Sequence, residues 1–334
     1  MPIVADAPVL AIRADGGVGI GAGHVMRSVA LADAWRHGGG RVEWFCRPLP
    51  AMLQGLLDTR AITTHAMDGG WPDVERWAAA HPGAWVCVDG YGFADGPARL
   101  RSAGARVLVI DDDGRWGRYE CDVLLNQTVG AERLQYETVV GATRLLGSQY
   151  CLLRSEFLAR GPAPARVGPV RRVFVAFGGH DAHQQTARVV PLLRSRWPEA
   201  QIDVAAGLMP GAPARPAEPR VSSLTGTDLS AAMREADLAI VAAGSICWEL
   251  AFLGVPALTF TVADNQELIA HGVQEAGAAR SLGWFDRVSD GEIVAALEAL
   301  SDGAERSAMS RRARALVDGR GGSRVVAVMR SAAA

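Results

Sequence analysis

Short apolar segments of strand length recur along the chain and alternate with segments of helix length. Most are apolar along their whole length rather than at every second residue, which is typical of strands buried on both faces. Such strands, separated by helices, predict an α/β fold with parallel sheets. The predicted strands are Val9–Arg13, Val42–Phe45, Trp85–Val88, Val107–Ile110, Val123–Leu125, Val173–Phe177, Ile202–Ala205, Leu238–Val241 and Ala257–Phe260.

The length of 334 residues exceeds the usual size of one core and predicts two domains. Three prolines and two glycines between Arg160 and Pro169 favour a linker there, because neither residue propagates regular structure. We predict a first Rossmann-like domain over 1–158, a linker over 159–170 and a second such domain over 171–334. The last helix is a candidate to pack back on the first domain.

Two helices can be placed from local patterns. Apolar and small residues share one helical face between Val25 and Trp35, which predicts a helix directly after the first glycine-rich turn. A second helix is predicted over Ile246–Leu253, ended by Gly254 and the following Pro256.

Charge and cysteine content exclude several classes of protein. Lys+Arg 34 against Asp+Glu 36 leaves a net charge of -2, which does not favour nucleic acid or an anionic membrane as a partner. The five cysteines are widely spaced and predict buried, reduced thiols. The longest apolar region, Ala236–Ala263, is interrupted by Gly254 and Pro256 before it could span a bilayer. We therefore expect a cytoplasmic protein.

A glycine-rich turn after the first predicted strand is the strongest candidate for a binding loop. Five glycines lie between Asp15 and His24, where the backbone can approach a ligand and the next helix offers free N–H groups. The spacing fits neither the dinucleotide-binding fingerprint nor a Walker lysine motif. The same glycines would also suit a plain strand-to-helix turn with a capping histidine.

His24 favours the functional interpretation, because it follows the carboxyl end of the first strand, where such folds bind ligands. Imidazole can take a proton from water near neutral pH, so His24 is the predicted catalytic base. Asp15 is a candidate to orient His24 or to bind a substrate hydroxyl, and equally a local backbone acceptor. Further candidate substrate contacts in this segment are Arg13, Gly21, Gly23 and Arg27.

A second strand end, small-residue turn and helix start occurs at Ala242–Leu250. Gly244, Ser245 and Ile246 could present N–H groups and a hydroxyl to a diphosphate, and Glu249 could reach a ribose. Ser245 as a simple helix N-cap, with Glu249 in solvent, is the alternative.

Several ordered motifs together resemble one family. They are Arg13–Arg27, Val88–Gly92, Ile110–Asp113, Cys121–Asn126, Tyr150–Phe157, Phe177–Asp181, Ala243–Leu250 and Ala263–Gln266. In this order they are similar to the UDP-sugar hydrolases of the pseudaminic acid pathway, a group that includes spore-coat polysaccharide proteins and looks like the MurG type of GT-B glycosyltransferase. The resemblance covers roughly Leu10 to Trp284 and is more specific than any single motif.

The resemblance implies a GT-B-like fold, with two Rossmann-like domains whose parallel sheets face a central cleft. It implies release of UDP from a 2,4-diacetamido-2,4,6-trideoxyhexose by water attack at the anomeric carbon, with inversion and without a metal. The family's base falls on His24, and a substrate-side tyrosine falls on Tyr91. The nucleotide contacts fall on Gly178, Gly179, Gly244, Ser245 and Glu249, and the sugar or diphosphate contacts on Asn265 and Gln266.

This chain departs from the family pattern at His180, Gln184 and Ile246, so the reaction type is better supported than the identity of the sugar. His180 and His183 supply only part of a tetrahedral metal site. The aspartates of Asp111–Asp113 suit loop capping and a solvated face better than Mg²⁺ binding. We predict no metal and no cofactor.

The sequence thus predicts a metal-independent nucleotide-sugar hydrolase, monomeric or weakly dimeric, whose partners are a UDP-sugar and UDP. One alternative is a GT-B glycosyltransferase with a UDP-amino-sugar donor. Another is a nucleotide-sugar hydrolase of a specialised-metabolite pathway with a different sugar. A non-catalytic nucleotide-sugar binding subunit is a third.

Overall fold

The computed structural model describes residues 7–17, 19–164, 167–178, 185–206 and 219–332. The chain divides into two compact units. Unit 1 comprises Met1–Ser155 and Arg320–Ala334, and unit 2 comprises Glu156–Gly319. The predicted linker at 159–170 therefore begins a few residues after this boundary, inside helix α5 (Ser155–Arg160).

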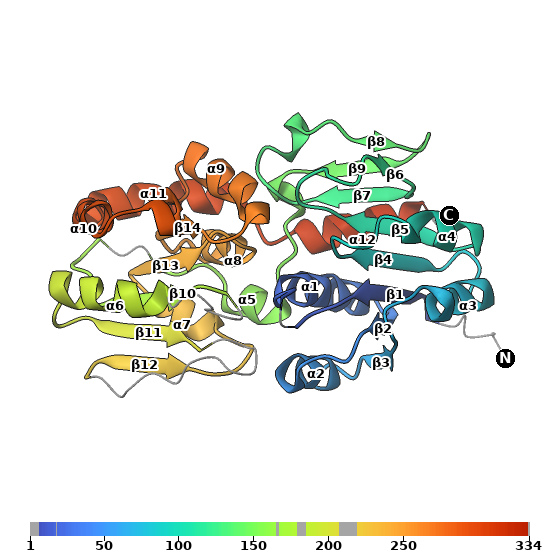
Figure 1. The fold of residues 1–334 in the computed structure, drawn as a ribbon, viewed down its shortest axis with the longest axis horizontal. Helices are drawn as coiled ribbons and strands as arrows, with labels where there is room; N and C mark the ends of the chain where they lie inside the picture. Colours follow the sequence, from blue (N-terminus) through green and yellow to red (C-terminus); the bar gives the residue numbers. More distant parts are fainter. Residues whose placement is uncertain (1–6, 18, 165–166, 179–184, 207–218, 333–334) are drawn as a thin grey trace. The chain divides into compact units, whose positions relative to one another are not determined.

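The described part of unit 1 is built on a seven-stranded parallel sheet with the order β3-β2-β1-β4-β5-β7-β9 (Figure 1). Strand β1 lies between β2 and β4, so the first glycine-rich turn leaves the sheet beside the end of β4. The strands are β1 (Val9–Ala14), β2 (Arg41–Cys46), β3 (Thr63–Ala66), β4 (Trp85–Asp89), β5 (Arg106–Ile110), β7 (Val123–Asn126) and β9 (Thr143–Leu146).

Helices cover both faces of this sheet, as the continuous apolar strands require. Val86 and Val88 of β4 share a buried cluster with residues of α3 (Pro72–Ala80) and α4 (Gly96–Ser102). On the other face, the Trp85 indole donates to the carbonyl of Met329 in α12 (Gly321–Ser331), at 3.0 Å. Because side chains alternate along a strand, Asp89 shares the face of Trp85.

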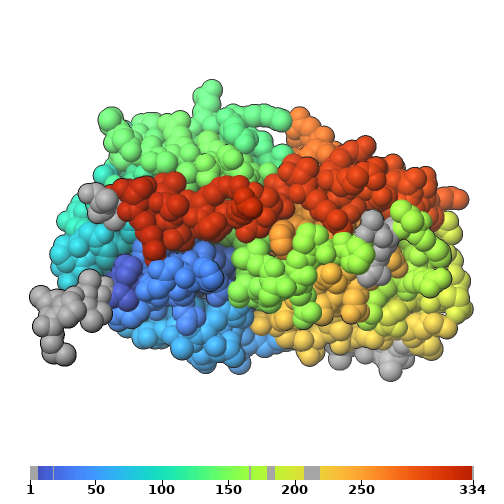
Figure 2. Space-filling view, turned by 180° about the vertical axis from the view of Figure 1, so that it is seen from behind, coloured from blue at the N-terminus to red at the C-terminus, as the bar shows by residue number. Residues whose placement is uncertain are grey.

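Helix α1 (Gly23–His37) is buried on more of its surface than a single amphipathic stripe would need. The reason is that it contacts both the central strands β1 and β2 and the C-terminal helix α12. Figure 2 shows the C-terminal residues, in red, against the N-terminal segment, in blue. Helix α12 is therefore part of unit 1, although it follows unit 2 in the chain. Helix α2 (Ala51–Asp58) also belongs to unit 1.

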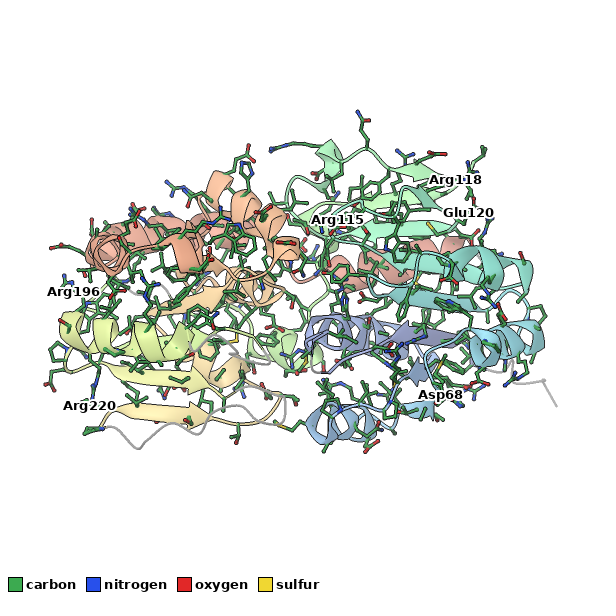
Figure 3. All side chains as sticks on the ribbon, viewed as in Figure 1. Asp68, Arg115, Arg118, Glu120, Arg196 and Arg220 are labelled. Carbon is green, nitrogen blue, oxygen red and sulfur yellow. The ribbon has the colours of Figure 1, made fainter. Side chains whose placement is uncertain are left out.

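A small two-stranded sheet, β6 (Arg118–Tyr119) and β8 (Glu137–Thr138), adjoins the main sheet of unit 1. Its outer side is charged: Arg118 and Glu120, both labelled in Figure 3, form an ion pair at 2.6 Å. Its inner side is aromatic, because Tyr119 and Tyr136 are buried in the same cluster as the main sheet. The short helices η1 (Ala131–Arg133) and η2 (Ser148–Tyr150) complete this region.

In its described residues, unit 2 contains a six-stranded parallel sheet with the order β12-β11-β10-β13-β14-β15. Its strands are β10 (Arg172–Ala176), β11 (Gln201–Ala205), β12 (Val221–Leu224), β13 (Leu238–Ala242), β14 (Ala257–Thr261) and β15 (Arg280–Trp284). The surrounding helices are α6 (Gln185–Arg196), α7 (Ser230–Glu235), α8 (Ile246–Leu253), α9 (Glu267–Glu275), α10 (Asp290–Ala299) and α11 (Gly303–Leu316), with η3 (Asp264–Gln266) and η4 (Phe285–Arg287).

The predicted α/β class with parallel sheets is confirmed, and each predicted apolar segment lies within an observed strand, except Val173–Phe177, which extends one residue past the end of β10. Helix α8 begins and ends at the predicted residues, and the five cysteines are buried and form no disulfide, as predicted. Strands β3, β9, β12 and β15 were not predicted. They lie at sheet edges, where one side of the strand has no partner and the sequence is correspondingly more polar.

Candidate functional site

Carboxylates gather at the carboxyl ends of the central strands of unit 1. Asp89 is the last residue of β4, Asp111 and Asp112 follow β5, and Asp15 follows β1. These aspartates are all at most 6% exposed. Buried carboxylates need partners to offset lost hydration, so their contacts identify what this edge of the sheet holds in place.

His24 is paired with Asp89. The residue lies in the first turn of α1, and its Nδ1 is 2.6 Å from Oδ1 of Asp89. Among the described residues no hydrogen bond is found to Nε2. Asp15, the orienting carboxylate considered from sequence, pairs with Arg13 instead. Sequence reasoning missed Asp89, although a carboxylate ending the strand next to β1 was visible in Val88–Gly92.

Arg27 connects His24's partner to a second carboxylate. Its Nε lies 2.7 Å from Oδ2 of Asp89 and its Nη2 lies 2.6 Å from Oδ1, while Nη1 donates to Asp112. The Ser28 hydroxyl adds a bond to Oδ2 of Asp89, at 2.9 Å. Asp89 therefore accepts four hydrogen bonds from α1, which fills the capacity of a carboxylate. The sequence marked Arg27 as a substrate contact; its guanidinium is 7% exposed and held by two aspartates.

Tyr91 completes the chain of contacts. Its hydroxyl donates to Oδ2 of Asp112, at 2.8 Å, and its ring lies edge-on to the His24 ring with centroids 4.7 Å apart. Tyr91 is 45% exposed, so it borders the solvent-accessible side of His24. The solvated-face interpretation of Asp111–Asp113 is wrong for Asp112, which is buried between Arg27 and Tyr91.

The charges of this network determine which ring nitrogen of His24 carries the proton in the hydrogen bond to Asp89. Burial disfavours the charged form of Asp89, but the Arg27 guanidinium and His24 outweigh burial and hold the pKa of Asp89 well below its usual value. Burial likewise lowers the pKa of Arg27, yet Asp112 and Asp89 raise it above its ordinary value. An ionised Asp89 can only accept, so Nδ1 of His24 carries the proton of this hydrogen bond, and in the neutral form of the ring the lone pair lies on Nε2.

Arg13 and Asp15 form a separate buried pair. The two Nη atoms of Arg13 reach the two oxygens of Asp15, at 2.5 and 3.0 Å, and the guanidinium lies 4.1 Å from the ring centroid of Phe93. Asp15 also accepts from the backbone N–H of Arg47, at 2.8 Å. Arg13 is fully buried, so its contacts tie β1 to the neighbouring loops beneath the glycine-rich turn.

The glycine-rich turn is a tight loop in which Gly17 and Gly21 exchange backbone hydrogen bonds, at 3.0 and 2.8 Å. Gly21 has a φ of +82°, which a residue with a side chain rarely adopts. At Gly16 a Cβ would lie 2.7 Å from the Val25 side chain, so this glycine is needed for close packing. Gly23 then opens α1, which has no side-chain cap, leaving first-turn N–H groups available to a ligand.

Asp111 was also missed as a buried group. It accepts from the hydroxyls of Tyr119 and Tyr136, at 2.9 and 2.7 Å, and from the backbone N–H of Gly114, at 2.7 Å. Burial raises the pKa of Asp111, although these three donors oppose the effect. Consecutive residues after a strand point to opposite faces, which is why Asp111 holds the β6–β8 sheet while Asp112 turns to α1.

The second candidate binding turn, predicted at Ala242–Leu250, follows β13 in unit 2. Gly244 is partly exposed, with open space where a Cβ would lie, and Ser245 precedes α8. The Ser245 side chain makes no capping hydrogen bond, so the simple N-cap interpretation is not supported. Ile246 opens α8 and Glu249 lies in its first turn, partly buried. The hydroxyl and the first-turn N–H groups of α8 thus share one small-residue turn.

The remaining predicted contacts lie on two other loops of unit 2. Gly178, the second residue after β10, is exposed, and Gly179 lies outside the described residues, as do His180 and Gln184. Asn265 and Gln266 are partly exposed in η3, after β14. The Gln266 side chain accepts from the backbone N–H of Val262, at 2.9 Å, so its oxygen shapes its own loop.

Two kinds of feature are missing from the described residues. No group of three or more His, Cys, Asp or Glu side chains there could hold a metal ion; His180 and His183 lie outside that part. None of the helices in the described ranges combines the length and apolar character needed to cross a bilayer.

Sequence comparison relates the chain to two curated proteins. It is 28% identical over 233 residues to the spore coat polysaccharide biosynthesis protein SpsG of Bacillus subtilis, covering 67% of this chain and 68% of that protein. It is 22% identical over 273 residues to the uncharacterized protein MJ1062 of Methanocaldococcus jannaschii, covering 74% of this chain and 54% of that protein. The chain matches no protein-family model.

Solved structures share the fold over nearly the whole chain. The spinosyn forosaminyltransferase SpnP has a TM-score of 0.70 at 14% identity, covering 98% of this chain and 100% of that one. MurG of Acinetobacter baumannii has a TM-score of 0.63 at 18% identity, covering 97% and 99%. HepE of Anabaena, solved in complex with UDP-glucose, has a TM-score of 0.62 at 11% identity, covering 97% and 99%. The chain thus has two Rossmann-like domains of the GT-B type.

Proposed function

We propose that this protein hydrolyses a UDP-linked amino-deoxysugar, of the 2,4-diacetamido-2,4,6-trideoxyhexose type, to UDP and the free sugar. The observation that carries the proposal is the 2.6 Å contact between His24 and a buried, ionised Asp89, which leaves Nε2 as a proton acceptor. The similarity to a spore coat polysaccharide biosynthesis protein and the GT-B fold support a nucleotide-sugar substrate. So does the UDP-glucose bound to one fold neighbour.

In this proposal Nε2 of His24 takes one proton from a water molecule as the water oxygen bonds to the anomeric carbon. The bond from that carbon to the UDP oxygen breaks, and its electron pair leaves with UDP. Water attacks from the face opposite the leaving group, so the configuration inverts. Asp89 stabilises the imidazolium that forms, as a carboxylate does for a catalytic histidine. Tyr91, beside the ring, contacts the sugar, while Arg13 and Asp15 support the loop.

We assign the binding of the leaving group, UDP, to unit 2. UDP leaves with developing negative charge on its diphosphate, which helix N-termini can stabilise without a metal ion. The uncapped start of α8, with Gly244 and Ser245, suits this task, and Glu249 in the same turn would hold the ribose. Gly178 and Asn265, on neighbouring loops, would complete the nucleotide and sugar contacts.

A glycosyltransferase is the second candidate, favoured by the glycosyltransferases among the fold neighbours. The chemistry at His24 would be the same, with an acceptor hydroxyl in place of water. The two candidates differ in whether an acceptor is needed.

The test is a panel of UDP-linked amino-deoxysugars incubated with purified protein and no added acceptor. We expect release of free sugar, with the anomeric configuration of the first product inverted. The same turnover is expected after EDTA treatment. Turnover only with an added acceptor would replace hydrolysis by transfer, and a requirement for Mg²⁺ would refute the metal-independent step. Saturable UDP binding without any turnover would favour a binding subunit.

A further inference from the structure

The buried groups around His24 carry more negative than positive charge. Asp89 and Asp112 contribute two negative charges and Arg27 one positive charge, and all three side chains are at most 7% exposed. With a neutral His24 the network therefore carries a net charge of about -1, and a protonated His24 would bring it to zero. In a buried site that balance favours the imidazolium formed when His24 takes a proton.

We propose that Arg27 is a positioning residue that sets this charge balance and, through Asp112, also fixes Tyr91. The inference rests on His24 being the base of the proposed hydrolysis. Without the guanidinium, two carboxylates would face His24 unopposed, and the ring would hold a proton before the reaction instead of accepting one during it. With the guanidinium, one of the two negative charges is offset, and the pull of the network on a proton at His24 is weaker.

The geometry explains why an arginine serves here. Nε and Nη2 hold both oxygens of Asp89, and Nη1 holds Asp112, so one rigid group spaces two carboxylates. A lysine ammonium carries the same charge but cannot hold both oxygens of one carboxylate in this fork. Charge and geometry can therefore be separated by substitution at this position.

Asp112 extends the network to the exposed side of the site. One oxygen accepts from Arg27 and the other accepts the Tyr91 hydroxyl, at 2.8 Å. The orientation of Tyr91 thus depends on the same guanidinium that holds the partner of His24. Arg27 thus links the base and the tyrosine beside it from a buried position.

The groups facing the His24 ring come from two elements and one loop. Asp89 ends β4 and approaches Nδ1 at 2.6 Å, Arg27 of α1 approaches the same atom at 3.2 Å, and Tyr91, after β4, meets the ring edge. Asp112, after β5, is one contact further away. Removal of Arg27 and removal of the Asp112 charge should therefore affect His24 in opposite directions.

The test follows the ring nitrogens of His24 by ¹⁵N NMR across a pH series in the full-length protein without substrate. The His24 signals are assigned by their loss in His24→Gln. In Arg27→Gln we expect the titration midpoint of His24 to rise by at least about one pH unit, because a full charge about 3 Å away is lost. In Asp112→Asn it should fall, by less. Arg36→Gln, on the exposed last turn of α1, is the matched control and should change nothing.

Arg27→Lys separates charge from geometry. We expect its midpoint to stay near that of the unmodified protein, while turnover falls at least about 10-fold because the fork on Asp89 is lost. The proposal is overturned if Arg27→Gln and Asp112→Asn leave the midpoint unchanged or move it in the same direction. A midpoint in Arg27→Lys that moves as far as in Arg27→Gln would also overturn it.

The outcome is independent of the proposed function, because the NMR series needs no turnover. The predicted shifts together with no sugar release would refute hydrolysis and leave the charge balance standing. Sugar release without the shifts would leave hydrolysis standing and remove the role of Arg27.

Discussion

Asp89 decides what His24 can do, because a carboxylate that can only accept leaves the ring one usable tautomer. The four hydrogen bonds from α1 fix the carboxylate, and the guanidinium beside it holds the pKa of Asp89 low, so it remains ionised throughout the range in which His24 could act. The catalytic potential of the site therefore depends on a residue that does not itself reach solvent.

The first prediction concerns Asp89→Asn. An amide nitrogen can donate to Nδ1 and favour the opposite tautomer, which would turn Nε2 from an acceptor into a donor. We expect sugar release to fall at least about 100-fold, as for loss of a general base, with little change in UDP affinity. Steady-state kinetics and calorimetry with UDP measure the two quantities. Near-normal turnover would show that Asp89 does not orient the base.

At the scale of elements, the β6–β8 sheet is held to the main sheet by Asp111 through Tyr119 and Tyr136. Burial raises the pKa of Asp111 above its unfolded value. A raised pKa means that this residue's contribution to stability is fully present below about pH 3.9 and is lost as the pH rises through the folded value.

The second prediction follows from the raised pKa of Asp111. In urea titrations between pH 4 and pH 8, the free energy of unfolding of the unmodified protein relative to Asp111→Asn should be highest at pH 4 and decline towards neutral pH, because asparagine does not titrate. Other groups titrate equally in both proteins and cancel in the difference. A constant difference across this range would mean that Asp111 has the same pKa in the folded and unfolded chains.

The sequence predicted the elements better than it predicted the contacts between them. The central strands and helices α1 and α8 could be placed because their patterns are local and fully buried. The pairing of His24 with Asp89 could not, since the two residues are 65 positions apart and meet only through the parallel order β1-β4. Arg13 and Arg27 look like ligand contacts in sequence, but burial assigns their charges to aspartates.

At the scale of the whole molecule, the chain leaves unit 1 for unit 2 and returns with α12. Val325 and Met329 of this helix are fully buried, and the Met329 carbonyl accepts the Trp85 indole N–H at 3.0 Å. Helix α12 therefore contributes to the core that carries His24, from the far end of the sequence.

The third prediction is that Met329→Ala destabilises unit 1 selectively. Truncating a fully buried methionine costs about 2–5 kcal/mol of unfolding free energy. Hydrogen exchange followed by mass spectrometry should show faster exchange in unit 1 peptides, with unit 2 peptides unchanged. The matched control is Val294→Ala, at a position 38% exposed on α10. Equal loss of protection in both units would contradict the assignment of α12 to the core of unit 1.

The fourth prediction concerns Glu249 and follows from the proposal that unit 1 supplies the base and unit 2 binds UDP. Glu249→Ala should weaken UDP binding in calorimetry while turnover at saturating substrate changes less, which is the signature of lost uniform binding. Glu305→Ala, exposed on α11, is the matched control. A large loss of turnover at saturation with unchanged UDP affinity would assign Glu249 to the chemical step instead.

The central claim, that His24 is the base and that unit 2 binds the nucleotide, is tested most directly by His24→Ala. Free-sugar release from a UDP-amino-deoxysugar and UDP affinity should be measured on the same preparations of the variant and the unmodified protein. The account predicts that turnover falls at least about 100-fold while UDP affinity stays the same. Near-normal turnover, or a loss of UDP binding in step with activity, would contradict it.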